Sequence, residues 1–155
     1  GVIKELPSNN SDPSYIPYND RFIMGGNGIP YGNVLRGYDD NRVGPLTSSG
    51  NPIGGNTLMK FSTEFRVPFA ENPVVYGMIF AEMGNVWSST DLMERLNLPR
   101  SGPLDLKRSV GVGVRFFMPM IGMLGFDLGR GFDRVDINGK LKPEWKTTLT
   151  FGQQF

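Results

Sequence analysis

The residues of this chain that could perform chemistry are carboxylates, lysines, tyrosines and serines. Among its 155 residues there is no His and no Cys, so an imidazole base, a thiolate nucleophile, a disulfide and a cysteine-histidine zinc cluster are all excluded. The sequence Gly111-x-Gly113 has no third glycine at the spacing of a dinucleotide-binding fingerprint, and no helix is predicted after it. We therefore expect a protein that is not an enzyme and that binds no cofactor.

Acidic residues of the predicted loops are the remaining candidates for a binding site. They are Asp39, Asp40, Asp133 and Asp136. Because they lack the spacing of a calcium-binding loop, we interpret them as solvated loop carboxylates and expect no metal site. The formal net charge of +1, from 16 basic and 15 acidic residues, offers no electrostatic footprint for nucleic acid, so none is expected as a partner.

The elements that must position any functional residue are predicted by alternation of apolar and polar side chains. The clearest case is 109–118, where every second residue is apolar over ten residues. Four further strands are predicted at 57–67, 74–87, 124–129 and 144–155. Residues 74–87 are apolar on both faces, which indicates that something also packs against the inner side of that strand.

The connections between these predicted strands alternate in length. Short turns are expected at 68–73 and 119–123, and long loops at 88–108, with a helical turn near 92–96, and at 131–143. This alternation is typical of outer-membrane barrels, whose strands cross the bilayer with about 9–11 residues. A mean hydropathy of −0.24 is compatible with such a protein, because alternating strands leave little mark on the average.

A soluble antiparallel β-domain with one solvated face is the alternative that periodicity leaves open. Its apolar faces would meet in a core, and glycine would be rarer on its polar faces. Five strands are also too few to close a bacterial barrel, whose smallest members have about eight. We predict an all-β fold, namely an antiparallel transmembrane β-barrel segment that is incomplete on its own. Since the chain opens at Gly1 without an initiator Met, we expect a processed or truncated segment.

The first 55 residues form a second region, rich in Gly, Pro, Asn, Asp and Ser and with little alternation. We therefore divide the chain into a long loop at 1–55 and five strands at 56–155. The loop contains the sequence Leu-Arg-Gly-Tyr-Asp-Asp-Asn-Arg-Val-Gly-Pro at 35–45, and Gly-Gly-Asn at 54–56 leads into the next strand. With Ala-Glu-Met-Gly-Asn-Val-Trp at 81–87 and the Phe-x-x-x-Phe ending, these motifs resemble the C-terminal barrel of the BamA family, the outer-membrane β-barrel assembly factors. The resemblance covers essentially the whole chain.

The resemblance implies that Arg36, Gly37 and Tyr38 lie at the tip of a long loop that folds back into the lumen of a sixteen-stranded barrel. An arginine in that position is poorly hydrated and needs carboxylate partners, which its planar fork suits. Glu64 and Glu82 match the positions of the acidic partners in the family, so we predict a cluster with Arg36 that pins the loop. In the alternative interpretation, Arg36 is solvated and both glutamates belong to ordinary polar strand faces.

An inward Glu82 would also set the orientation of its whole strand. Because side chains alternate along a strand, Tyr76, Met78 and Phe80 would then lie inside. This placement explains why the strand is apolar on both faces. The glycine excess, 21 residues in all, falls on inward strand positions and in the loop, as expected where an inserted loop approaches the sheet backbone.

The last predicted strand ends in an aromatic residue preceded by apolar residues at even spacings. These residues are Trp145, Leu149, Phe151 and Phe155. The pattern resembles the C-terminal signal that barrel-assembly machinery reads in its clients, although Gln153 is polar where an apolar residue is common. The resemblance implies that this strand forms one side of a seam between the first and last strands of the barrel. The alternative is a strand that happens to end in Phe.

The function implied by the resemblance is that of a non-enzymatic insertion factor of the bacterial outer membrane. Its partners would be outer-membrane lipid, client β-barrel proteins and accessory lipoproteins of an assembly complex. Isolated, the chain is expected to self-associate through its open edges. Two alternatives stay open: a polypeptide-secreting transporter of the same superfamily, and a soluble β-rich binding module.

Overall fold

The fold is all-β, as predicted, and it is built from one antiparallel sheet. The computed structural model describes residues 1–3, 16–28, 32–89, 93–94, 96–98, 101–102, 104–120, 122–135 and 140–151. The strands are β1 (Thr57–Glu71), β2 (Val74–Trp87), β3 (Lys107–Met118), β4 (Gly122–Gly131) and β5 (Glu144–Phe151), preceded by the short 3₁₀ helix η1 (Tyr18–Asp20). Every strand pairs with its neighbours in sequence, in the order β1-β2-β3-β4-β5.

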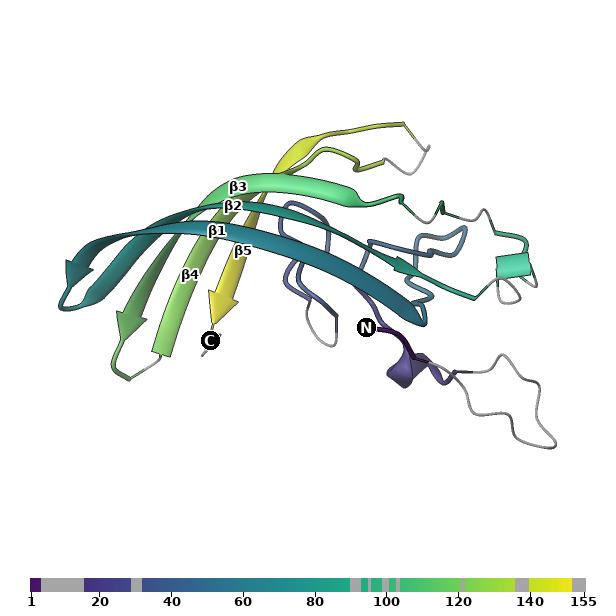
Figure 1. Cartoon of the computed structure of the whole chain (residues 1–155), viewed down its shortest axis with the longest axis horizontal. Helices are drawn as coiled ribbons and strands as arrows, with labels where there is room; N and C mark the ends of the chain where they lie inside the picture. Colours follow the sequence, from purple (N-terminus) through teal and green to yellow (C-terminus); the bar gives the residue numbers. More distant parts are fainter. Residues whose placement is uncertain are drawn as a thin grey trace.

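The sheet is curved, and the N-terminal loop lies on its concave side (Figure 1). Among the strands that the structure describes, β1 and β5 each have a single partner. The sheet is therefore open, which agrees with the prediction of a barrel segment that is incomplete on its own.

The two faces of the sheet differ in the way that the alternation predicts. On the convex face, large apolar side chains are exposed, among them Phe65, Ile79, Val112, Phe126 and Trp145. Nothing in the described chain covers them, and an apolar surface of this extent suits contact with lipid. On the concave face of β2, Met78 and Phe80 are buried and Tyr76 is half-buried, as predicted from the position of Glu82.

The predicted turn at 68–73 is wrong in its extent. β1 continues through Pro68 to Glu71, and only Asn72 and Pro73 connect it to β2. Proline suggested a break because it cannot donate to a β-ladder. Here β1 lies at one edge of the described sheet, and its register shifts between Pro68 and Ala70, so the irregularity is absorbed as a bulge.

The loop forms a small core of its own against β2. Met24, Leu35, Tyr38 and Val43 are buried together with Val86, and Phe22 and Leu58 pack against this cluster. Short backbone bridges, such as those of Met24 with Asn33 and Val43, hold the loop strands together. The loop is thus a packed unit, and Arg36 lies in sequence between two of its core residues, Leu35 and Tyr38.

The predicted helical turn near 92–96 is described only in part. Met93 and Glu94 are helical, whereas Leu92 and Arg95 lie outside the described residues. In the described parts of the chain, no helix has the length and apolar character needed to cross a membrane.

Candidate functional site

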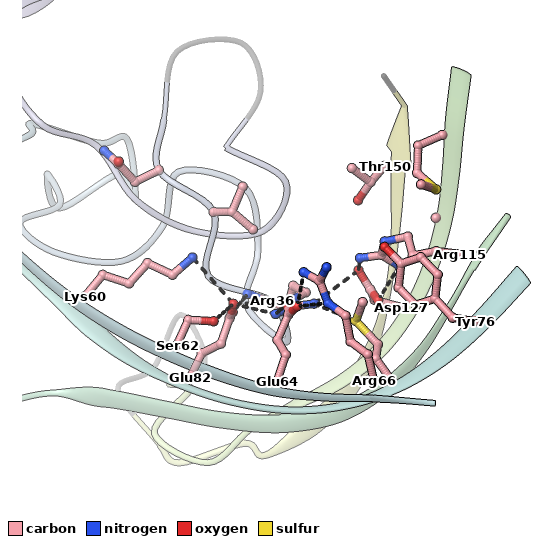
Figure 2. Close-up of a pocket in the computed structure, with 15 residues that line it drawn as sticks. Arg36, Lys60, Ser62, Glu64, Arg66, Tyr76, Glu82, Arg115, Asp127 and Thr150 are labelled. Atoms are coloured by element: carbon pink, nitrogen blue, oxygen red, sulfur yellow. Dashed lines mark hydrogen bonds and ion pairs between the residues drawn. The ribbon is translucent and has the colours of Figure 1, made fainter. Parts of the chain in front are cut away.

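Arg36 lies between the loop and the concave face of the sheet, where the structure brings it against both predicted glutamates (Figure 2). Its Nη2 donates to Oε1 of Glu64 at 2.6 Å and to Oε1 of Glu82 at 2.7 Å, and its Nε donates to the same Glu82 oxygen at 3.1 Å. The backbone N–H of Arg36 donates to Oε2 of Glu82 at 2.9 Å. Glu82 therefore binds both the side chain and the backbone of the loop tip.

A third carboxylate, which sequence reasoning missed, completes the site. Oδ2 of Asp127 on β4 lies 3.7 Å from Nη1 of Arg36. Arg115 on β3 binds the same carboxylate with both terminal nitrogens, at 2.7 and 2.6 Å. Both residues lie on inward strand faces, and their pairing depends on the register in which Gly113 lies opposite Asp127.

Two further cations border the site on β1. Nζ of Lys60 lies 3.4 Å from Glu82, and Nη2 of Arg66 lies 2.6 Å from Glu64. Ser62 donates from its hydroxyl to Glu82 at 3.1 Å. Each of the three carboxylates thus contacts two cations. We call this set the charge cluster: Arg36, Lys60, Glu64, Arg66, Glu82, Arg115 and Asp127.

The face of the Arg36 guanidinium is covered by apolar side chains. Its central carbon lies 3.7 Å from the centre of the Phe80 ring, and Nη1 lies 3.4 Å from the sulfur of Met78. Burial by itself would lower the pKa of Arg36, but hydrogen bonds and charge attraction to Glu82 raise that pKa above its usual value. Arg36 stays charged, and removing it would leave Glu82, which is only 4% exposed, without its main partner.

Glycines allow the loop tip to reach the sheet backbone. Gly37 has a φ of 85°, and a Cβ placed there would lie 2.8 Å from the backbone nitrogen of Gly131. From the other side, a Cβ on Gly129 would lie 2.9 Å from the nitrogen of Gly37. Loop and strand are therefore in backbone contact, and neither position has space for a side chain.

Tyr38 attaches the loop to the ends of β3 and β4. Its hydroxyl donates to the carbonyl oxygen of Arg108 at 2.8 Å and accepts from the backbone N–H of Asp133 at 3.3 Å. Burial of the ring raises the pKa of the Tyr38 phenol to about 12. The structure thus places all three residues of the Arg-Gly-Tyr sequence against the sheet, each through a different kind of contact.

Asp39 extends these contacts to β5. Its carboxylate lies 2.6 Å from Nη2 of Arg134 and 2.8 Å from Nζ of Lys146. Burial alone would raise the pKa of Asp39, but hydrogen bonds from Lys146 and Arg134 hold it below its usual value. The interpretation of the loop acids as merely solvated is therefore wrong for Asp39, and also for Asp133, which pairs with Arg108 at 2.8 Å.

Two of the four aromatic and apolar residues predicted in the C-terminal signal lie exposed on the convex face. Trp145 and Phe151 are 53% and 62% exposed, and Leu149 is half-buried on the same face. Phe155 lies outside the described residues. Asp136, named among the loop acids, also lies outside them. Within the described ranges, no group of three or more potential ligands could hold a metal ion.

A curved antiparallel sheet with an apolar convex face and a loop bound to its polar concave face is the architecture of an outer-membrane β-barrel segment. Residues 6–155 match the Omp85 superfamily domain, and the chain belongs to that superfamily. Its members are bacterial outer-membrane proteins of protein assembly or secretion. A search of curated proteins finds no match.

Proposed function

We propose that this chain is the C-terminal part of a BamA-type barrel that inserts client β-barrel proteins into the outer membrane without enzymatic chemistry. The observation that carries this proposal is that β5, unlike the other outer strand β1, contributes no residue to the charge cluster. β5 pairs with β4 from Glu144, opposite Gly131, to Phe151, opposite Leu124, and its other edge, like that of β1, has no partner among the described strands. The unpaired N–H and C=O groups of such an edge can template an incoming strand.

The distribution of buried charge supports a seam at β5. The charge cluster ties the loop to β1, β2, β3 and β4. The inward residues that β5 places nearest to it are Thr148, opposite Asp127, and Thr150. The ion pair of β5 with the loop, Lys146 to Asp39, is about 40% exposed on both sides, so it is worth little. A second ion pair of β5, Glu144 with Arg134, has side chains that are 37% and 11% exposed. Among the described residues, β5 can thus separate from β4 without breaking an ion pair that is buried on both sides.

In this proposal the accessory lipoproteins of an assembly complex bind the full-length protein, and client strands pair with β5. The test is site-specific photocrosslinking in cells that express the full-length protein together with a client arrested during insertion. A crosslinker at Thr147, on the outward face of β5, should label the terminal strand of the client. The matched control is Ile79, which is also outward and 62% exposed but has a paired strand on both sides. Equal labelling from both positions, or none from Thr147 while the client is arrested, would contradict the proposal.

A second candidate function is secretion of a polypeptide past the concave face. The observation that favours it is a polar cavity of about 310 Å³, lined by charge-cluster residues together with Thr150 and Tyr76. A secreted polypeptide would pass inward-facing side chains, whereas an inserted client would meet the edge of β5. Crosslinking from Thr150, and not from Thr147, would therefore support secretion over insertion.

A further inference from the structure

The convex face carries charge in one region only. Among the outward strand positions that the structure describes, from Thr57 to Phe151, the charged residues are Arg108 on β3 and Arg130 on β4. Antiparallel pairing brings them to the same end of the sheet, because Arg130 lies opposite Val110 and the N–H of Phe132 donates to the carbonyl of Arg108 at 2.9 Å. This is the end at which the long loops leave the sheet.

The two arginines differ in their partners. Arg108 donates to Asp133 from Nε at 3.1 Å and from Nη2 at 2.8 Å. Arg130 is half-buried, and its Nε is shielded from solvent without a hydrogen-bond partner. Its guanidinium forms no ion pair with any residue in the described ranges. A lipid-facing arginine costs about 2–4 kcal/mol at the bilayer midplane and about 0–1 kcal/mol near the interface, so this end of the sheet belongs at the level of the headgroups.

Aromatic side chains around Arg130 indicate the same level. Trp145 lies opposite Arg130 on β5 and is 53% exposed, and Phe132 lies two residues further along the chain and is 41% exposed. Aromatic residues gather at membrane–water interfaces, where one side of the ring contacts acyl chains and the other contacts headgroups. The unpartnered guanidinium is therefore placed where lipid phosphates are available.

An apolar groove begins beside the arginines on the same face. It has a volume of about 490 Å³ and is lined mainly by outward residues of four chain segments, with Arg108 at its rim. The outward apolar and small residues that line it are Phe61, Thr63, Ala81, Met83, Val110 and Phe132. Arg108 lines the groove, and Arg130 lies opposite Val110, which also lines it. The groove and the two arginines together therefore match the polarity of a lipid, with a charged end and an apolar body.

We propose that Arg130 and Arg108 bind the phosphate of an anionic lipid in the leaflet on the long-loop side, with one acyl chain of that lipid in the groove. Arg130 supplies free N–H donors in the planar fork that binds phosphate oxygens in pairs. Arg108 adds positive charge while keeping its contact with Asp133. The lipid gives the unpartnered guanidinium its missing acceptors, and the site is independent of whether the protein inserts or secretes polypeptides.

The test is native mass spectrometry of the full-length protein in detergent, titrated with bisphosphorylated lipid A or with the same lipid after removal of its phosphates. The wild-type protein should retain the phosphorylated lipid and lose most of that retention when the phosphates are absent. Arg130→Gln should weaken retention of the phosphorylated lipid about tenfold, because a hydrogen bond to a charged group is lost. Lys140→Gln removes an exposed charge from the connection between β4 and β5, at the same end of the sheet. This variant should leave retention unchanged.

A second variant separates the groove from the arginines. Ala81→Trp should fill the groove and lower lipid retention, while excess inorganic phosphate should displace little of the bound lipid from the wild-type protein. Equal retention by wild type and Arg130→Gln would overturn the proposal, as would full displacement by inorganic phosphate. A lipid-independent dimer that Ala81→Trp abolishes would assign the groove to a second copy and overturn it too. Heat-modifiable electrophoretic mobility verifies that each variant is folded.

Discussion

The concave and convex faces of β2, β3 and β4 consist of alternate residues of the same strands. The two faces have different surroundings, which place different requirements on their residues. On β3, the inward residues Gly111 and Gly113 are buried beside Phe80 and Asp127, whereas the outward residue Val112 is 51% exposed. The inward residues are shaped to particular partners in the loop and on neighbouring strands. Apart from Arg108 and Arg130 at the long-loop end, the described outward residues are mainly apolar. The concave face should therefore be sensitive to the identity of its residues, and the convex face to their polarity.

The largest effect is expected at the centre of the charge cluster. Arg36→Ala removes the cation that holds Glu64 and Glu82, and it leaves Glu82 buried without its main partner. Breaking a buried pair in this way costs about 3–5 kcal/mol. Urea unfolding of the full-length protein in lipid vesicles should show this loss, and limited proteolysis should show faster cleavage within the loop.

The control for this change also removes the negative charge of Glu82, which would otherwise remain buried without Arg36. In Arg36→Ala combined with Glu82→Gln, part of the lost free energy of unfolding should return, because no buried carboxylate is left uncompensated. Wild-type assembly and unchanged protease resistance of the loop in Arg36→Ala would refute loop pinning by this residue.

A charge on the convex face should be the next most costly change. Val112 lies near the middle of β3 and faces outward, so Val112→Arg would place a guanidinium in hydrocarbon. The expected loss is about 2–4 kcal/mol in the free energy of unfolding in vesicles. Val112→Leu should change it little, since the face requires only apolar character. If both variants were equally stable, this face would not be in contact with lipid.

Two glycines with similar positive φ angles separate strain from packing. Gly37 and Gly122 have φ values of 85° and 91°. A Cβ on Gly37 would meet β4 backbone atoms at 2.8 Å, whereas a Cβ on Gly122 would meet nothing within 4 Å. Gly122→Ala should therefore show backbone strain alone, on the order of 1 kcal/mol. Gly37→Ala should lose about 1–3 kcal/mol more, because the added methyl group overpacks the contact. The same urea titration measures this loss, and equal losses in the two variants would rule out close backbone contact with the loop.

Sequence reasoning found the features of each face that depend on alternation. The inward position of Glu82 predicted the orientation of Met78 and Phe80, because side chains two and four residues apart on a strand point to the same face. The position of Arg36 against two glutamates came from a resemblance, and the structure shows these contacts at 2.6–2.7 Å. In both cases the information lies in spacing along one strand or in one motif.

The features that sequence reasoning missed depend on registers between strands. The pairing of Arg115 with Asp127, and that of Asp39 with Lys146, joins residues on different elements, and no local spacing reveals it. Pro68 misled the prediction of a turn for a related reason. Whether a proline interrupts a strand depends on whether its missing N–H is needed in the ladder with the neighbouring strand, and here the ladder shifts register beside it.

The smallest effect is expected at the loop contact that is neither charged nor sterically tight. Tyr38→Phe removes one donated and one accepted hydrogen bond at the end of the sheet, with an expected cost of about 1 kcal/mol at neutral pH. The folded protein raises the pKa of the Tyr38 phenol to about 12, from 10.0, because burial disfavours the phenolate. This contribution to stability is complete below pH 10 and declines as the pH rises toward 12, where the unfolded chain ionises first. Tyr38→Phe lacks that decline, so the stability advantage of the wild-type protein should shrink above pH 10 in paired urea titrations. A constant advantage across this range would mean that the Tyr38 phenol is open to water in the folded protein.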